Sequence, residues 1–404
     1  MTDPLILVIN SGSSSLKFAV QDPDRREPRL AGLADRLGQT QATITIKQNG
    51  GDITRTLPQP TLAAALDALL AELGERGWLH ALGAVGHRVV HGGEHFARSV
   101  VITPEVLADL EACSPLAPLH NPPALLAIHT AMEKLPDVPH VAVLDTAFHQ
   151  TMPPAAFFYA LPMALYRELD VRRFGFHGTS HRFVAGEAVR LLGLDPNDHG
   201  LVTAHLGNGA SATAVQDGRS VDTSMGMTPL EGLVMGTRCG DVDAGALSLI
   251  ARRKALDWDA LDAMLNHQSG LLGLSELSND CRELEQAAQH GHAGAQLALD
   301  VFVHRLARYI GGLAMALRRL DAVVFTGGIG EHSIYVRAMT MRRLGPLGLA
   351  LDAAANQRMV GGAAGVISTG TRPAAMVIPT NEEWMIARDA AELAGLSPRG
   401  SDAR

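Results

Sequence analysis

One turn of the chain has residue types suited to binding a phosphate group. Gly207-Asn208-Gly209 follows the apolar run 201–206 and precedes a second run of small and apolar residues, 210–215. Small residues on both sides of Asn208 let backbone N–H groups come close to an anion, which larger side chains would prevent. The pattern therefore favours a phosphate-binding turn between two strands.

A dinucleotide fingerprint is the competing interpretation of the same turn. Residues 207–212 fit G-x-G-x-x-A after a predicted strand. That motif requires a helix directly after the turn, whereas residues 210–215 show no helical period and end on Asp217-Gly218. We therefore prefer the phosphate-binding turn.

The same pattern occurs near the N-terminus. The apolar run 5–10 leads through Gly12 and the serines 13–15 into a second apolar run, 16–21. Two such strand–turn–strand patterns, about 200 residues apart, indicate an internal duplication, in which two similar domains bind a shared phosphate. Two unrelated hairpins are the alternative.

Charged residues follow two further apolar runs. Arg88 and His91 end the run 84–91, and Asp145 ends the run 141–145. Strand ends of this kind are where α/β proteins usually build their sites. For Arg88 alone, a surface ion pair is the alternative.

Two histidines have the spacing of a metal-binding pair. His177 and His181 stand at i and i+4, as on a helix that binds zinc. Gly175 and Gly178 disfavour a single helix that carries both,. The sequence therefore argues against a zinc site here.

Length, composition and charge limit the class of protein. The chain has 404 residues, of which 47% are apolar and 19% charged, enough for two domains with full cores,. A net charge of −8 without Lys/Arg clusters argues against nucleic acid or an anionic membrane as a partner,. No long apolar stretch or signal peptide is visible, so we expect a cytoplasmic protein. Three cysteines without C-x-x-C spacing suggest neither disulfides nor a zinc finger,.

The elements between the motifs predict two domains. Pro153-Pro154 interrupts both helix and strand, so we expect one domain over 1–150, joined by a C-terminal helix over 386–404, and another over 151–385. The other predicted elements are a hairpin over 42–58, helices 62–73, 124–132 and 302–320, a loop over 270–286, strands 321–327 and 374–380, and a last helix that begins at Glu382 with Asn381 as its cap.

Several strings together are specific enough to indicate a family. They include NSGSSSLKFA (10–19), GHRVVHGGEH (86–95), APLHNPPA (117–124), LDTAFHQTMPP (144–154), GFHGTSHR (175–182), HLGNGA (205–210), DTSMGMTPLEGLVMGTRCGDV (222–242), FTGGIGEH (325–332) and PTNEEW (379–384). With these strings in this order, the chain resembles the acetokinase family of the actin, hexokinase and Hsp70-like ATPase superfamily. The resemblance runs from Leu5 to about Leu393,.

This resemblance implies a fold and a reaction. The fold is α/β, with duplicated ribonuclease H-like domains that flank an active-site cleft. The reaction is reversible transfer of the γ-phosphoryl group of ATP to acetate with Mg²⁺, or Mn²⁺ in its place, in a homodimer. A P-loop is excluded independently, because the chain contains no Gly-Lys dipeptide,. The alternatives are a propionate or butyrate kinase of the same family and an actin- or Hsp70-like ATPase that binds protein partners.

The resemblance also implies roles for individual residues. Arg88 and Arg238 would clamp the carboxylate and the transferring phosphoryl group, since a guanidinium binds planar oxyanions with two hydrogen bonds. His177 would donate a hydrogen bond to the equatorial oxygens. Asp145 is the fourth catalytic residue and, with Asn10 and Glu382, would position the metal. For Glu382, favourable placement of an acid in the first turn of a helix is the alternative.

Two further groups follow from the same resemblance. The nucleotide-binding residues would be Asn10, Ser13, Ser15, Lys17, His205, Leu206, Gly207, Asn208, Gly209, Asp280, Cys281, Arg282, Gly328, Ile329 and Gly330. The acetate-binding residues would be Arg88 and His120 for the polar end and Val90, Leu119, Phe176 and Pro229 for the methyl group.

Three positions depart from the family pattern: His332 stands where asparagine is common, Cys239 where serine is common, and Ala244 where proline is common. Cys239 directly follows Arg238, and a thiol beside a guanidinium can have a lowered pKa and react as the thiolate. We therefore take a reactive Cys239 as a hypothesis. A buried, inert cysteine is the alternative.

Overall fold

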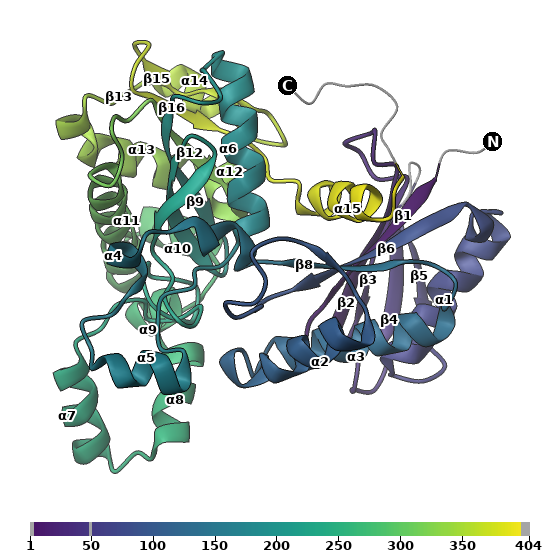
Figure 1. Cartoon of the computed structure of the whole chain (residues 1–404). Helices are drawn as coiled ribbons and strands as arrows, with labels where there is room; N and C mark the ends of the chain where they lie inside the picture. Colours follow the sequence, from purple (N-terminus) through teal and green to yellow (C-terminus); the bar gives the residue numbers. More distant parts are fainter. Residues whose placement is uncertain (1–3, 48–50, 397–404) are drawn as a thin grey trace. The chain divides into compact units, whose positions relative to one another are not determined.

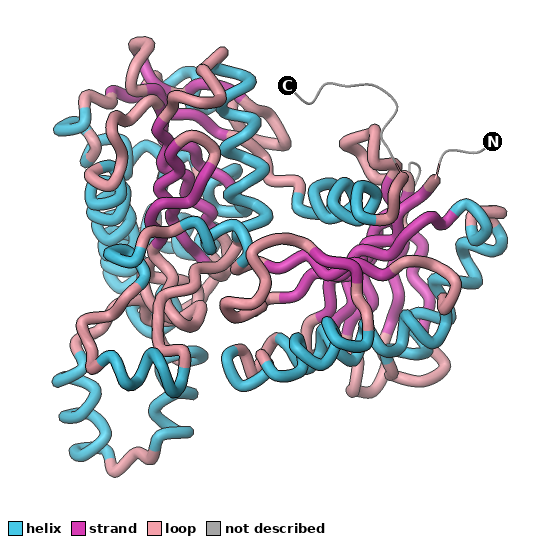
Figure 2. The backbone as a smooth tube through the Cα atoms, in the orientation of Figure 1, coloured by secondary structure: helices cyan, strands magenta, loops and turns pink. Residues whose placement is uncertain are grey.

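The computed structural model describes residues 4–47 and 51–396, and these form two compact units. The described residues up to 148 and from 381 onward form unit 1, and residues 149–380 form unit 2. Each unit has a sheet at its centre with helices packed against it (Figure 2).

The sheet of unit 1 has eight strands in the order β5-β4-β3-β2-β1-β6-β8-β7. β1 pairs antiparallel with β2 and parallel with β6, which pairs parallel with β8. The strands are β1 (Leu5–Ser11), β2 (Ser15–Gln21), β3 (Leu30–Asp35), β4 (Thr43–Lys47), β5 (Ile53–Thr56), β6 (Leu82–Val89), β7 (Val100–Val101) and β8 (His140–Leu144).

Alternation along β1 explains how both faces of this sheet are covered. Successive side chains of a strand point to opposite faces. Leu5, Leu7 and Ile9 pack in one core with α1 (Leu62–Glu75) and α3 (Asn121–Lys134). Ile6 and Val8 pack in a second core with the last helix, α15 (Glu382–Leu393). A strand buried on both faces needs a continuous apolar sequence, which is what this run has.

The sheet of unit 2 has six strands in the order β11-β10-β9-β12-β16-β14. They are β9 (Gly200–Leu206), β10 (Ala210–Gln216), β11 (Arg219–Thr223), β12 (Ala322–Thr326), β14 (Gly365–Val366) and β16 (Ala374–Val377). A short separate pair, β13 (Ala350–Leu351) and β15 (Ser368–Thr369), lies beside them. α6 (Gly178–Leu192) and α11 (Ala293–Ala314) flank the larger sheet (Figure 1).

The two sheets share one topology, which confirms the predicted fold class. In β3-β2-β1-β6-β8 and in β11-β10-β9-β12-β16, three antiparallel strands continue into two parallel ones. The two predicted strand–turn–strand patterns are β1–β2 and β9–β10, in equivalent positions of the two sheets. This is the duplicated arrangement expected of an actin-, hexokinase- and Hsp70-like fold.

The remaining helices surround these sheets. They are α2 (Pro104–Ala112), α4 (Pro154–Phe157), α5 (Met163–Leu169), α7 (Ala244–Lys254), α8 (Trp258–His267), α9 (Gly270–Ser275), α10 (Cys281–Gln289), α12 (Gly327–His332), α13 (Ile334–Arg343) and α14 (Ala353–Arg358). None of the helices in the described ranges combines the length and apolar character needed to cross a lipid bilayer.

Several predicted elements need correction. Residues 270–286 are not a loop but hold α9 and most of α10, and the side chain of Asp280 caps α10 by accepting from the Arg282 N–H. The long helix does not reach residue 320. It ends at Ala314, after which i→i−3 bonds such as that from the Leu317 N–H to the Ala314 carbonyl tighten the chain. The centre of the turn in the 42–58 hairpin lies outside the described residues.

The last helix begins at Glu382, with the side chain of Asn381 accepting from the Trp384 N–H, as expected. The predicted span 386–404 therefore begins inside α15, and residues 397–404 lie outside the described ranges.

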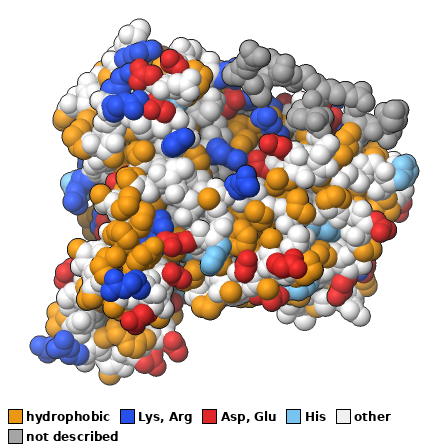
Figure 3. Space-filling model, in the orientation of Figure 1, with side chains coloured by type: hydrophobic (Ala, Val, Ile, Leu, Met, Phe, Trp, Pro, Cys, Tyr) orange, Lys and Arg blue, Asp and Glu red, His pale blue; other side chains and the backbone are white. Residues whose placement is uncertain are grey.

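Helices α5, α7 and α8 of unit 2 carry exposed apolar side chains. The space-filling view shows such side chains among charged ones on this part of the surface (Figure 3). Trp258 at the start of α8 is 82% exposed, and Leu249 on α7 and Leu169 on α5 are each 58% exposed.

Candidate active site

The parallel strands of unit 1 bring three predicted site residues together. Asn10 lies near the end of β1, Arg88 near the end of β6, and Asp145 directly after β8. Arg88 donates from Nε to Asp145 Oδ1 at 3.0 Å, from Nη2 to Asp145 Oδ2 at 2.6 Å and from Nη1 to Asn10 Oδ1 at 3.3 Å. The guanidinium is thus held with its plane and direction fixed.

The Arg88–Asp145 pair is not a surface ion pair, which corrects the alternative raised above. The side chain of Arg88 is 22% exposed and that of Asp145 only 1%. Burial by itself would lower the pKa of Arg88, but the charge and hydrogen bonds of Asp145 outweigh it and hold the pKa above its ordinary value,. Arg88 therefore stays cationic.

Glu382, at the first position of α15, has an unsatisfied acceptor in the same unit. Its Oε1 is buried and accepts no hydrogen bond. Burial raises the pKa of Glu382 to about 7; the charge of Arg88 lowers it, and those of Asp145 and Glu383 raise it. A favourable helix position does not explain a buried acceptor without a donor, because such a group costs free energy. A cation beside this oxygen would compensate for that cost.

The serine turn of unit 1 is tight and carries an ion pair. The Gly12 N–H donates to the Ser15 carbonyl at 2.8 Å, and Ser13 between them is exposed. Lys17 on β2 pairs with Glu383 on α15. Of the residues predicted to bind nucleotide in this unit, Lys17 therefore already has a carboxylate partner.

In unit 2, His177 and Arg238 converge on the turn after β9. His177 immediately precedes α6 and has a left-handed backbone with φ of 56°. A Cβ atom added to Gly209 would lie 2.7 Å from Arg238 Nη2 and 3.5 Å from His177 Nε2. A residue with a side chain at position 209 would therefore displace the arginine, which explains why glycine suits this turn.

The loop that carries Arg238 is fixed by backbone hydrogen bonds. The Gly236 N–H donates to the Asn208 carbonyl at 2.9 Å, and the Leu271 N–H on α9 donates to the Met235 carbonyl at 2.8 Å. Arg238 Nη1 donates to the Pro229 carbonyl. Burial lowers the pKa of Arg238, and within the described part of the chain no carboxylate pairs with it. Its charge is thus suited to an incoming anion.

The predicted nucleotide residues of unit 2 gather at one edge of its sheet. β12 pairs with β9, so Thr326 stands opposite His205. Gly327, with φ of 75°, packs so closely on Leu206 that an added Cβ would lie 2.8 Å from its carbonyl oxygen. This contact places Gly328, Ile329 and Gly330 on α12 near the turn 207–209.

The helix α10 extends this group. Asn279, just before it, donates from Nδ2 to Asn208 Oδ1 at 3.2 Å. Asp280 and Arg282 form an exposed ion pair at 2.7 Å. Cys281 is buried, and burial raises the pKa of its thiol, with Glu285 adding to the effect. Asn279 was not predicted from the sequence.

The residues predicted around the acetate methyl group belong to both units. In unit 1, Val90 follows β6 and Leu119, 52% exposed, precedes His120 at the start of α3. In unit 2, Phe176 is 1% exposed, and its carbonyl accepts from His149 Nε2 at 2.9 Å. Pro229 is connected to Arg238 through its carbonyl.

Cys239 and the pair His177 and His181 are the other side chains of unit 2 for which the sequence raised an expectation. The hypothesis that Arg238 lowers the pKa of Cys239 is wrong: burial raises that pKa, and the charges that act on the thiol are those of Arg305 and Asp241. Cys239 Sγ instead donates to the Gly240 carbonyl at 3.1 Å. His177 and His181 do not lie on one helix, as predicted, because α6 begins at Gly178 and carries only His181. His177 Nδ1 and His181 Nε2 both bind the hydroxyl of Ser211.

Acidic residues suited to a metal are few. Within residues 4–47 and 51–396, no group of three or more His, Cys, Asp or Glu side chains is placed to hold a metal ion. The fit to a metal in unit 1 therefore rests on Glu382 and Asp145 with the amide of Asn10.

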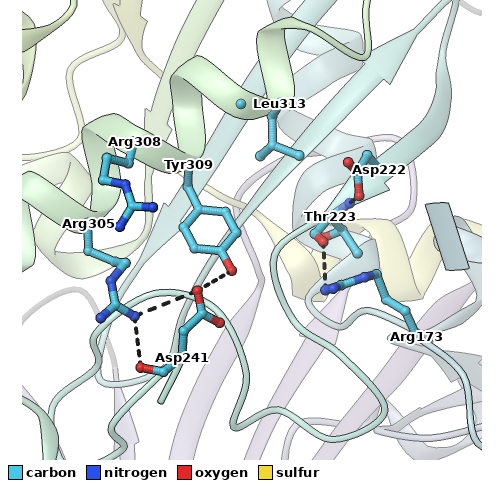
Figure 4. A pocket seen from close by; sticks show the side chains of 9 residues that line it. Arg173, Asp222, Thr223, Asp241, Arg305, Arg308, Tyr309 and Leu313 are labelled. Carbon is cyan, nitrogen blue, oxygen red and sulfur yellow. Dashed lines mark hydrogen bonds and ion pairs between the residues drawn. The ribbon is translucent and has the colours of Figure 1, made fainter. Parts of the chain in front are cut away.

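A cavity of about 380 Å³ in unit 2 involves none of the predicted site residues (Figure 4). Its lining is largely self-paired: Tyr309 donates to Asp241 Oδ2 at 2.7 Å, and Arg173 Nη1 donates to the Thr223 carbonyl at 3.0 Å. Arg305 and Arg308 line it from α11. Arg305 also pairs with Asp241, at 3.7 Å.

Comparison with known proteins gives one consistent result. A model of the Acetokinase family matches residues 5–388. The acetate kinase of Chromobacterium violaceum is 54% identical over 392 residues, which cover 97% of this chain and 99% of that protein. The propionate kinase of Yersinia enterocolitica is 51% identical over 401 residues, which cover 99% and 98%.

Solved structures agree. The acetate kinase of Porphyromonas gingivalis superposes with a TM-score of 0.92 at 40% identity, covering 96% of this chain and 99% of that one. A propionate kinase from Francisella tularensis gives the same TM-score and identity, with 96% and 100% covered. These relatives and structures are kinases, and together with the duplicated sheets they identify a kinase with an actin- and hexokinase-like fold. The chain belongs to the Acetokinase family.

Proposed function

We propose that this kinase transfers the γ-phosphoryl group of ATP reversibly to acetate, giving acetyl phosphate and ADP. The observation that carries the proposal is the strand edge of unit 1, where Arg88 is held by Asp145 and Asn10 in a chain that matches acetate kinases along its length. A carboxylate oxygen attacks the γ-phosphorus, the bond to the β–γ bridging oxygen breaks, and its electron pair stays on ADP.

Each group has a defined part in this reaction. Arg88 binds the acetate carboxylate and orients the attacking oxygen. Arg238, which has no carboxylate partner among the described residues, stabilises the charge that develops on the phosphoryl oxygens,. His177 donates a hydrogen bond to the same oxygens. Asn208 and the turns after β1 and β9 hold the phosphates through backbone N–H groups.

The residues of unit 1 fit a divalent metal. Mg²⁺ prefers oxygen ligands and keeps part of its hydration, so one or two carboxylates suffice. The buried, donor-free Oε1 of Glu382 and the nearby Asp145 would supply them, and Asn10 would add an amide oxygen. When bound, the metal would neutralise charge on the phosphate oxygens. Mn²⁺, which also favours oxygen ligands, would suit the same residues.

The experiment traps the product with hydroxylamine. Purified protein is incubated with MgATP, hydroxylamine and acetate, and the acetyl hydroxamate is quantified against ADP. We expect hydroxamate and ADP in equal amounts, and ADP release that depends on acetate. ADP release without acetate, and no hydroxamate, would contradict the proposal and favour an ATPase that acts on another partner.

A propionate kinase is the second candidate, because relatives of similar identity carry that name. The same assay with propionate and butyrate separates the two: kcat/KM highest for acetate supports our proposal, and highest for propionate supports the second candidate.

We also propose that the protein is a homodimer in the cytoplasm, as predicted. Among the exposed apolar side chains of unit 2, Trp258 and Leu249 are the ones that we expect a second copy to cover. Sedimentation equilibrium tests it: a mass twice that of the 42.7 kDa chain is expected, and a monomer at micromolar concentration would contradict it.

A further inference from the structure

A chain of buried hydroxyl and imidazole groups ends at His177. Ser211 Oγ lies 2.8 Å from His177 Nδ1 and 2.8 Å from His181 Nε2. His181 Nδ1 in turn lies 2.8 Å from Thr203 Oγ1. Ser211, His181 and Thr203 are each 0% exposed, so water does not compete for these bonds. Which group donates and which accepts in each of these hydrogen bonds therefore depends only on the hydroxyl and imidazole groups of this chain.

The number of protons on these groups leaves two arrangements of donors and acceptors along the chain from Thr203 to His177. Ser211 has one hydroxyl proton and can donate it to only one of its two histidine neighbours. If both histidines donated to Ser211, its buried hydroxyl proton would have no acceptor among the described residues, since its only hydrogen-bond contacts there are these two rings, and an unsatisfied buried donor costs free energy,. His181 stays neutral, because burial and the charges of His149 and His205 keep its pKa well below the ordinary value, so it has one N–H. Either Thr203 donates to His181, which donates to Ser211, which donates to His177, or every bond runs the opposite way.

The position of Thr203 favours the first arrangement. In the opposite arrangement its hydroxyl would have to donate elsewhere, and the available acceptor is the Thr213 carbonyl at 3.5 Å. A contact of that length is a poor hydrogen bond, whereas the 2.8 Å contact to His181 Nδ1 is a good one,. The hydroxyl of Thr203 therefore donates to His181 Nδ1 in the favoured arrangement.

We propose that Thr203, His181 and Ser211 form a proton-ordered relay that keeps His177 neutral with its proton on Nε2. That nitrogen is the one on the side of Gly209 and Arg238. His177 then presents a hydrogen-bond donor to an anion without becoming imidazolium, and protonation of Nδ1 would require Ser211 to reverse its bond. Thr203, His181 and Ser211 are positioning residues. That His177 binds a phosphate group rests on the proposed function, whereas its tautomer does not.

The charged and titratable groups around His177 are consistent with a neutral ring. His205 stacks on it with 4.3 Å between ring centroids, His181 lies at 6.5 Å, and Arg238 approaches it across Gly209. His149 faces His181 at 5.8 Å. A second positive charge beside Arg238 would be repelled, so a neutral donor suits this environment.

The direct test is NMR of protein labelled with ¹⁵N in its histidines. The signal of His177 is assigned as the one lost in His177→Gln. At pH 7 we expect shifts typical of an unprotonated Nδ1 and a protonated Nε2. A protonated Nδ1 with bare Nε2, or an imidazolium, would overturn the relay. This NMR measurement needs no substrate. It can therefore refute the relay in a protein that has acetate kinase activity, and it can support the relay in a protein that lacks this activity.

A kinetic test uses two matched serine variants. Ser211→Ala breaks the relay, whereas Ser220→Ala removes a buried hydroxyl whose hydrogen-bond partner is His149 Nδ1, at 2.9 Å. We expect Ser211→Ala to lower kcat about tenfold at pH 8, the value of one lost hydrogen bond, and to recover toward the parent at pH 6, where imidazolium restores the donor. For Ser220→Ala, the ratio of its kcat to that of the parent should be the same at pH 6 and pH 8.

Folding is checked separately by thermal melting of both variants. If Ser211→Ala lowers kcat by the same factor at pH 6 and pH 8 while it melts like Ser220→Ala, the serine is only structural and the relay is refuted. Should Ser211→Ala fail to fold, the NMR measurement on the parent protein still decides the matter.

Discussion

Gly209→Ala tests how closely Arg238 must be placed. Gly209 does not have a left-handed backbone, so alanine fits its conformation. The new Cβ would lie 2.7 Å from Arg238 Nη2, where an ordinary contact is 3.4 Å or more, so the guanidinium must move by about 0.7 Å. A displacement near 1 Å in a catalytic group costs on the order of 100-fold. We therefore expect kcat to fall about 10- to 100-fold.

The stability of the variant should not fall, because the displaced atom is the end of a flexible side chain and a compatible Gly→Ala change stabilises by about 0.4–1 kcal/mol. Gly186→Ala on α6 is the matched control, since its Cβ would meet nothing within 4 Å. The assay is steady-state acetyl hydroxamate formation, with urea unfolding alongside.

The double variant Gly209→Ala/Arg238→Ala identifies the cause. If alanine acts through the arginine, the double variant should be no slower than Arg238→Ala alone, because the two changes remove one interaction. Full activity in folded Gly209→Ala, or losses that multiply in the double variant, would refute the reasoning.

Four further outcomes are expected. Arg88→Ala should lower kcat by about 10³ or more, as for arginines that stabilise phosphoryl transfer; near-normal kcat in folded protein would contradict its role. Val90→Ala should narrow the preference for acetate over propionate, which we place at about 1–3 kcal/mol in the parent; a kcat/KM ratio unchanged by the substitution would place Val90 outside the methyl site. Glu382→Gln should weaken Mg²⁺ binding in calorimetry with a nucleotide analogue, unless no metal is held there, in which case affinity stays the same. His87 is buried, and burial and His140 lower its pKa, so the folded protein favours its neutral form. The free energy of unfolding that depends on this group is fully present above pH 6.5 and should fall by up to about 1.4 kcal/mol per pH unit below it. His87→Leu should therefore flatten the dependence of urea unfolding on pH between pH 7 and 5.5.

The central strands and turns could be predicted because their signals are local. Both glycine turns follow short apolar runs, and the run 5–9 is apolar at every position because both of its faces are buried. Arg88 and Asp145 could be expected near one another, since both end apolar runs, and parallel strand ends meet at one sheet edge.

The missed features depend on tertiary contacts. Helix α9 is short and contains two glycines, and it is held by bonds from Leu271 and Leu272 to the Arg238 loop, which no local pattern reveals. Cys239 was placed beside Arg238 from adjacency, but consecutive side chains can point different ways. The Ser211–His181 bond joins two elements 30 residues apart, so only the fold could show that both serve His177.

The most direct test of the proposed reaction follows an oxygen atom. With ¹⁸O-labelled acetate and MgATP, attack by the carboxylate oxygen on the γ-phosphorus must leave one ¹⁸O bonded to phosphorus in acetyl phosphate. The account predicts an isotope-shifted ³¹P NMR signal for the whole product, with unlabelled ADP. Acetyl phosphate without phosphorus-bound ¹⁸O, or inorganic phosphate in its place, would contradict transfer to acetate.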